Sequence, residues 1–293
     1  KIKALGFQWE TNDPFLFCVH HEDKFPAGNE KMGPISNLEG RYLGQDFIVK
    51  DGFRMYHGME VPGFPGHPHR GFETITVVRE GLVDHADSTG AAGRYGNGDV
   101  QWMTAGSGIL HEEFHSEGFA KNGGTLNMVQ LWVNLPAKFK MTKPGYQAIL
   151  DKQIPAIDLE NGAGQARIIA GEFNGHTGPA NTFTPLSVID LKLKKGSTGI
   201  PVSEGWNTSL VVLKGAVEAG EGVVAKDAQM LMFSNQGQDI EVNVLEDSIA
   251  LLLSGEPINE PIVGYGPFVM NTKEEIAQAM QDFNSGSFGK IAH

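Results

Sequence analysis

The sequence contains a single cysteine, Cys18, among 293 residues. One cysteine excludes an intramolecular disulfide and any metal knuckle built from several thiolates. Basic residues are also scarce, because 23 Lys and Arg stand against 35 Asp and Glu, which gives a net charge of −12. Binding to nucleic-acid phosphates depends on neutralisation by Lys and Arg, so we expect no direct nucleic-acid partner.

Long apolar runs are missing as well. The longest, such as IALLL at 249–253, are far shorter than the ~20 residues that cross a bilayer as a helix, so no membrane partner is expected. No charged segment followed by an apolar stretch opens the chain, which argues against a secretion signal. These absences favour a cytoplasmic protein.

Short apolar segments bounded by Gly, Pro, Asn or Asp recur along the chain, FETITVV, LNMVQLWVNL and LSVIDLKL among them. Such segments, together with 38 glycines and 15 prolines, are typical of an all-β sandwich or barrel. The clearest helix pattern is TKEEIAQAMQDF near the C-terminus. There Thr272 and Glu275 form a capping-box pattern, and Gly286 would end the helix.

Two stretches of the chain resemble each other. HPHRGFETITVVREG (67–81) aligns without gaps on PVSEGWNTSLVVLKG (201–215), so that Gly71 matches Gly205. The residues that are kept are turn glycines and strand apolar residues. This internal repeat indicates two related β domains.

We place the first domain at 1–135 and the second, which ends in the helix, at 146–293. The segment 136–145, rich in Lys and Pro, is expected to be a linker. Eight of the ten histidines lie at or before position 115, and Pro201 and Ser203 replace the first histidine pair in the second copy. Any metal site therefore belongs to the first domain.

The motif HPH places His67 and His69 at positions i and i+2 of a predicted strand, where side chains project from the same face. Two imidazoles aimed at one point are what a metal site requires. Glu73 follows His69 by four residues and nominally shares that face. When the motif is taken alone, a polar strand start is the alternative explanation.

A second motif, GDVQWMTAGSGILHEEFH (98–115), delivers His111 and Glu113 after a glycine-rich turn, again two residues apart. Two such pairs brought together across a barrel would supply three imidazoles and one carboxylate. This donor set suits a non-heme ferrous ion with open coordination positions, and zinc would accept it as well.

Several longer segments resemble the pirin family of two-domain cupins: GFPGHPHRGFET, GDVQWMTAGSGILHEE, QLWVNLP, DPFLFCVHH and GPFVMNTKEEI. The resemblance implies an all-β fold of two cupin (jelly-roll-like) β-barrels that face each other, with a short C-terminal helix. It also implies one Fe(II) per chain in the N-terminal barrel, held by His67, His69, His111 and Glu113, with Glu73 outside the ligand set. Other divalent metals such as Zn, Ni, Mn or Cu could occupy such a site.

Five further side chains lie on strands that should flank the metal and are candidates to line a substrate pocket: Gln101, Met103, His115, Gln130 and Trp132. Core packing is the alternative for each of them, and a structural hydrogen bond is a further alternative for His115. His85, in DHADS, is expected in a turn or at the end of a strand.

Pirins are described as quercetin 2,3-dioxygenases, so the resemblance implies an oxidoreductase whose partners are a small aromatic substrate and dioxygen. Glu113 would serve as the general base. The rival interpretation is an iron-dependent regulatory protein that binds a transcription factor or a metabolic enzyme, which the acidic composition also suits. The retained ligand set with open positions favours the dioxygenase.

We expect the purified protein to hold about one equivalent of metal per chain, because only the first of the two related domains carries the histidine pairs. Elemental analysis of the full chain measures this content. A content of about two equivalents would contradict the assignment of the metal to the first domain alone.

Overall fold

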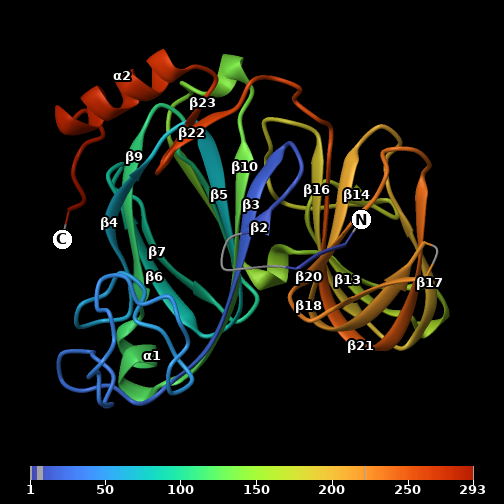
Figure 1. Ribbon diagram of the computed structural model, residues 1–293, viewed down its shortest axis with the longest axis horizontal. Helices are drawn as coiled ribbons and strands as arrows, with labels where there is room; N and C mark the ends of the chain where they lie inside the picture. The colour runs from blue at the N-terminus through green and yellow to red at the C-terminus, as the bar shows by residue number, and fades with distance from the viewer. Residues whose placement is uncertain (1, 5–8, 221, 293) are drawn as a thin grey trace. The chain divides into compact units, whose positions relative to one another are not determined.

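The computed structural model describes residues 2–4, 9–220 and 222–292 and consists mostly of β-strands (Figure 1). The helices of these ranges are α1 (Glu117–Asn122), α2 (Lys273–Asn284) and the short 3₁₀ helices η1 (Ala137–Phe139), η2 (Asp151–Gln153) and η3 (Glu160–Gly162). None of the helices in these ranges is long and apolar enough to cross a membrane. The predicted all-β fold with a short C-terminal helix is confirmed.

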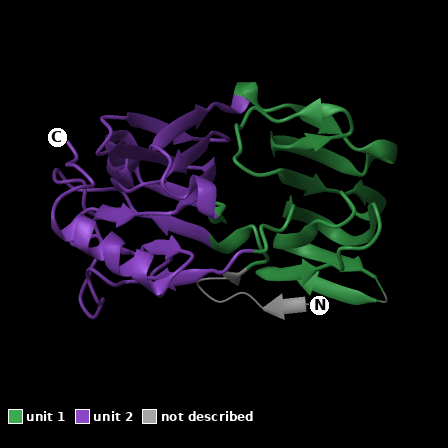
Figure 2. Ribbon diagram, turned by 90° about the horizontal axis from the view of Figure 1, so that it is seen from above, with its two compact units in different colours: residues 1–19, 131–136, 152–259 green, residues 20–130, 137–151, 260–293 purple. Residues whose placement is uncertain are grey.

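The structure divides into two compact units, each assembled from three segments of the chain (Figure 2). Unit 1 comprises residues 1–19, 131–136 and 152–259, and unit 2 comprises residues 20–130, 137–151 and 260–293. These units differ from the contiguous domains expected from the sequence. The expected linker, 136–145, leads directly into strand β11 (Gly145–Ile149), which pairs with β8 (Val100–Thr104). The C-terminal helix groups with unit 2, not with the unit of the second repeat copy.

Unit 1 is built on a nine-stranded antiparallel sheet. Its strands follow the order β1 (Ile2–Ala4), β20 (Gln229–Met232), β18 (Asn207–Ala219), β21 (Asp239–Gly255), β16 (Leu186–Leu193), β13 (Gly164–Ala170) and β12 (Ala156–Asp158), with β17 (Gly196–Pro201) on β21 and β19 (Val223–Lys226) on β18. Strands β14 (Glu172–Phe173) and β15 (His176–Thr177) form a hairpin. Alternate apolar residues such as Leu210 and Val212 face one buried core, as the period of two along a strand requires.

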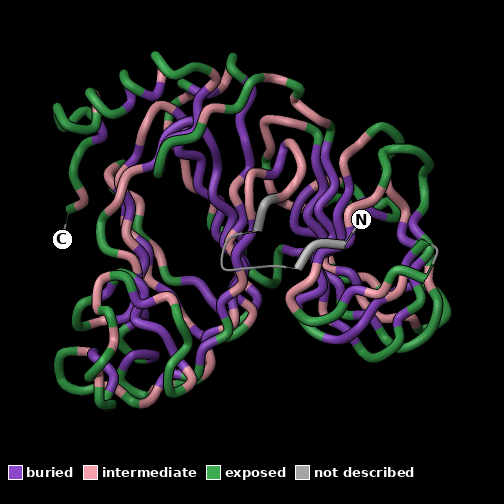
Figure 3. The backbone as a smooth tube through the Cα atoms, in the orientation of Figure 1, coloured by how far each residue is buried: buried purple, intermediate pink, exposed green. Residues whose placement is uncertain are grey.

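Two further sheets are formed mainly by strands of unit 2. One has the order β11, β8, β5 (Phe72–Glu80), β10 (Gly124–Asn134), β3 (Phe15–Phe25) and β2 (Trp9–Glu10), and the other has the order β4 (Gly63–His69), β9 (Ile109–His115), β6 (Leu82–Asp87) and β7 (Ala92–Gly96). Strands β22 (Val263–Tyr265) and β23 (Phe268–Met270) form a hairpin. Strand β5 is buried from Phe72 to Val78, so it forms the centre of its sheet (Figure 3).

The two α-helices, α1 and α2, begin and end at residues that are typical helix caps. The Thr272 hydroxyl accepts a hydrogen bond from the Glu275 N–H (3.1 Å), the Glu275 carboxylate accepts one from the Thr272 N–H (2.9 Å), and Gly286 follows the helix with a φ of +80°. The predicted capping box is therefore confirmed. Helix α1 was not expected from the sequence, although Ser116 caps its first turn and Gly123, with a φ of +69°, ends it.

The C-terminal segment is anchored to the end of strand β4, which finishes at His69. The N–H of the next residue, Arg70, donates to the Pro267 carbonyl (3.3 Å), and the Arg70 carbonyl accepts from the Val269 N–H (3.0 Å). The Arg70 guanidinium donates to Asp282 Oδ2 on α2 (2.8 Å). Residues from the far end of the chain therefore fix the end of the strand that carries two of the predicted ligands.

The turn after Arg70 requires a glycine at position 71. Gly71 has a φ of +89°, and a Cβ on it would lie 2.0 Å from the Val269 carbonyl oxygen. The buried Lys140 ammonium donates to the carbonyls of Gly71 (2.8 Å) and Val269 (2.9 Å) and so holds the two backbone segments together. A side chain at position 71 would force these segments apart.

We expect Gly71→Ala to destabilise the fold more than the matched substitution Gly205→Ala. Gly205 aligns with Gly71 in the repeat and has a similar φ of +83°, but no atom lies within 4 Å of its hypothetical Cβ. Gly205→Ala should lower the free energy of unfolding by about 1–2 kcal/mol, which is the cost of a left-handed alanine. Gly71→Ala adds the displacement of Val269. Urea unfolding compares the two variants, and equal losses would show that the close approach does not constrain the turn.

Candidate metal centre

Strands β4 and β9 bring the two predicted histidine-containing pairs together. In their antiparallel register His67 lies opposite His111, and a β-bulge separates His67 from Phe64. The ring centroids are 4.3 Å apart for His67 and His111, 4.8 Å for His67 and His69, and 4.9 Å for His69 and His111. One nitrogen of each ring lies within 4.8 Å of the others, so the three imidazoles can reach one ion.

The hydrogen bonds of these rings fit a metal site. His67 Nδ1 lies 2.8 Å from the Pro65 carbonyl, which can only accept, so Nδ1 carries the proton and Nε2 has the lone pair. His69 makes a hydrogen bond to the Pro267 carbonyl. Neither nitrogen of the fully buried His111 has a hydrogen-bond partner among the described residues. Buried polar atoms are normally satisfied, and a metal bond to His111 would meet that requirement.

Burial keeps the three imidazoles neutral. It lowers the pKa of His67, and it lowers the pKa values of His69 and His111 well below the ordinary range. Neighbouring imidazoles of the cluster act in the same direction on His69 and His111, because two positive charges would repel each other there. Neutral imidazole is the form that binds a metal.

Glu113 lies on the same face of β9 as His111 and is also buried. Its Oε1 accepts hydrogen bonds from the Tyr95 hydroxyl (2.7 Å) and the Gln101 amide (3.2 Å), and its Oε2 accepts one from the Gln130 amide (3.1 Å). Two of the five predicted pocket residues therefore contact Glu113. Their amide groups fix the orientation of the carboxylate.

Glu73, the alternative fourth ligand, lies in a different environment. Glu73 is 1% exposed, and its carboxyl group accepts a hydrogen bond from the Thr104 hydroxyl (2.7 Å). It belongs to neither of the two groups of described residues whose donor atoms are close enough to hold an ion. This arrangement favours Glu113 over Glu73 as the ligand.

His85 was not among the residues predicted for the metal site. The residue lies within strand β6, not in a turn, and its donor atom lies within 4.8 Å of those of His111 and Glu113. His85 Nε2 is 3.0 Å from Asp87 Oδ2. Burial alone would raise the pKa of Asp87, but hydrogen bonds from His85 and Thr89 outweigh burial and lower it. The spacing of two between His85 and Asp87, the same as in the predicted pairs, could have indicated a shared face.

Two other pocket candidates pack against apolar neighbours. Met103 is fully buried and packs with Ala105 and Ile109. Trp132 belongs to unit 1, where its ring lies against that of Phe17 with centroids 4.2 Å apart. For both residues the described contacts are those of core packing.

His115 lies among aromatic side chains. Its ring meets those of Phe25 and Phe119 edge-on, with centroid distances of 4.2 Å and 5.0 Å. Burial lowers the pKa of His115 to about 3, so this imidazole is neutral at any physiological pH. His115 continues the buried face of β9 but belongs to neither group of potential metal ligands among the described residues.

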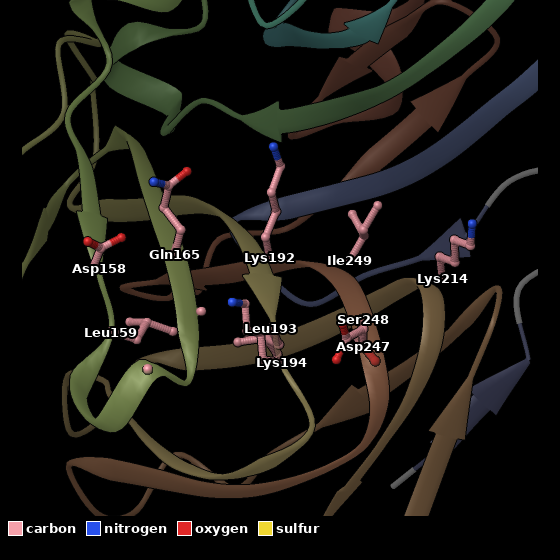
Figure 4. A pocket seen from close by; sticks show the side chains of 12 residues that line it. Asp158, Leu159, Gln165, Lys192, Leu193, Lys194, Lys214, Asp247, Ser248 and Ile249 are labelled. Carbon is pink, nitrogen blue, oxygen red and sulfur yellow. The ribbon is translucent and has the colours of Figure 1, made fainter.

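A cavity of about 820 Å³ lies in unit 1 (Figure 4). Five of its lining residues form one row across neighbouring strands: Asp158, Gln165, Lys192, Ile249 and Lys214. No predicted site residue lines this cavity. Both groups that could hold a metal, among the residues described, belong to unit 2.

The two β-rich units, one of them with a cluster of histidines and a carboxylate, define a two-domain cupin. The sequence profile described as Pirin matches residues 6–133, and the profile described as the Pirin C-terminal cupin domain matches residues 188–289. The chain belongs to the pirin family, as the sequence motifs predicted.

Relatives and solved structures agree with this assignment. A protein of Pseudomonas aeruginosa, provisionally named a quercetin 2,3-dioxygenase, is 52% identical over 77% of this chain and 79% of its own length. Human pirin is 37% identical over 83% of this chain and 82% of its own length. The crystal structure of a quercetin 2,3-dioxygenase from Acinetobacter baumannii has a TM-score of 0.85 and 40% identity, covering 100% of this chain and 98% of that one.

We expect Glu73 to contribute stability that is lost as the pH rises from 4.5 to about 7, because burial raises its pKa from 4.5 to about 7. In this window the folded state holds a proton that the unfolded chain releases, so the stabilisation is complete below the window and lost above it. The loss is on the order of 3 kcal/mol. Glu73→Gln should remove this component. Urea unfolding at several pH values measures it, and parallel profiles of the two proteins would refute the assignment.

Proposed function

We propose that this protein is a metal-dependent dioxygenase that cleaves the ring of a flavonol such as quercetin, with Fe(II) held by His67, His69, His111 and Glu113. The observation that carries the proposal is the buried His111 ring, which lacks a hydrogen-bond partner among the described residues and lies within reach of two other imidazoles. The names of the relatives from Pseudomonas aeruginosa and Acinetobacter baumannii support the substrate class.

A bound ferrous ion would supply a redox-active centre with open positions for an organic chelate and dioxygen. The chain contributes imidazole donors that are already oriented and uncharged, and a carboxylate held by hydrogen bonds. The carbonyls of Pro65 and Pro267 orient the rings of His67 and His69. Zn, Ni, Mn and Cu are the alternative metals for the same donors.

Glu113 is the candidate general base for the hydroxyl proton of a flavonol. The amides of Gln101 and Gln130 donate to its carboxylate and cannot take up the proton themselves. Burial raises the pKa of Tyr95 well above its usual value, so its hydroxyl remains a donor as well. A proton that Glu113 accepts therefore stays on the carboxylate until the substrate or water removes it.

Glu113→Gln should lower kcat/KM for quercetin by about 10²–10⁴-fold, because it removes the base while keeping the size of the side chain. The measurement is aerobic incubation of the Fe(II)-loaded protein with quercetin, followed by loss of the flavonol absorption band and by release of carbon monoxide. Metal content, determined for each variant, separates the loss of a base from the loss of the ion.

Glu73→Gln is the matched control, because Glu73 is also a buried carboxyl group, and its described partners are Thr104 and Trp102. It should retain both metal and turnover. Quercetin that stays intact with the metal-loaded wild-type protein would refute the dioxygenase and favour the regulatory alternative. Metal loss in Glu73→Gln with full occupancy in Glu113→Gln would reverse the assignment of the fourth ligand.

A further inference from the structure

A second set of donor atoms overlaps the three histidines of the candidate centre. Strand β6 pairs with β9 so that His85 lies opposite Glu113, and Asp87 lies opposite His111. The donor atoms of His85, His111 and Glu113 all lie within 4.8 Å of one another. Strand β9 thus has a potential ligand on each of its neighbours, His67 on β4 and His85 on β6.

Asp87 holds the His85 ring in the tautomer that a ligand needs. Asp87 Oδ1 accepts hydrogen bonds from the N–H (2.8 Å) and the hydroxyl (2.6 Å) of Thr89 and from the Ala91 N–H (3.3 Å). Its other oxygen faces His85 Nε2 at 3.0 Å. The carboxylate therefore accepts a hydrogen bond from Nε2–H, and in the neutral ring the lone pair then lies on Nδ1. A histidine oriented by a carboxylate in this way is a recurring feature of metal sites.

The Nδ1 atom of His85 is buried and has no hydrogen-bond partner among the described residues. The ring itself is 3% exposed, and it stacks on Tyr146 with centroids 4.7 Å apart and an angle of 18° between the planes. One ring nitrogen thus contacts a carboxylate, one ring face packs on an aromatic ring, and the second nitrogen has no hydrogen-bond partner among the described residues. Packing alone does not explain this combination of a carboxylate partner, a stacked ring and an unpartnered nitrogen.

We propose that His85 is an additional metal-ligating residue, which forms with His111 and Glu113 a second three-donor set that shares His111 with the set of His67, His69 and His111. The centre then has five donor side chains instead of four. The two sets share His111, and we assign both of them to one ion. This inference rests on the metal centre of the proposed function.

Titration of the metal-free full chain with Co²⁺, followed by its visible absorption, tests the proposal without any turnover. His85→Gln should weaken Co²⁺ binding at least about tenfold and change the absorption spectrum, and Asp87→Asn should weaken it by about 10–100-fold. His69→Gln should still bind Co²⁺ with the second set intact, whereas the double variant His69→Gln, His85→Gln should bind it more weakly than either single variant.

His115→Gln is the matched control, because His115 is a buried imidazole on β9 outside both donor sets. It should bind Co²⁺ like the wild type, and circular dichroism checks that each variant is folded. If His85→Gln keeps the wild-type affinity and spectrum while His111→Gln loses binding, the role of His85 is refuted and the proposed centre stands. If His111→Gln also binds normally, both the inference and the proposed metal centre are refuted.

Discussion

The candidate metal centre depends on the burial of several uncharged imidazoles at one place. A buried polar atom without a partner costs about 1–3 kcal/mol, so a core would not accumulate such atoms without a reason. Carbonyl groups of Pro65 and Pro267 orient the rings of His67 and His69, while His111 has no partner for either nitrogen among the described residues. In an ordinary core such unpartnered nitrogen atoms would destabilise the fold. Here they form a donor set that is oriented before a ligand binds.

Strand register, not sequence proximity, produces this arrangement. Strand β9 carries His111 and Glu113 on one buried face, and its two neighbours contribute His67 and His85. A slip of one residue would turn every one of these side chains to the opposite face. The β-bulge in β4 and the anchoring of Arg70 by the C-terminal segment secure the register where it matters for the site.

Local spacing in the sequence predicted much of this site. Pairs such as His67 and His69 share a face because strands repeat every two residues, and the capping box of α2 is equally local. His85 was missed because its relation to Glu113 arises from the pairing of β6 with β9, which periodicity does not reveal. The compact units were missed for the same reason. Contacts such as that of Arg70 with Asp282 join distant parts of the chain.

The two copies of the repeat separate what the fold requires from what the site requires. Gly71 and Gly205 keep nearly the same left-handed conformation, and each follows a strand that is paired on one side. Pro201 nevertheless stands at the position of His67 in the alignment, while the sheet of unit 1 retains its ladder and its apolar core. A β unit of this kind therefore does not need the imidazoles for its stability. Their concentration in unit 2, against the cost of burying polar nitrogen atoms, is best explained by the chemistry of a bound metal.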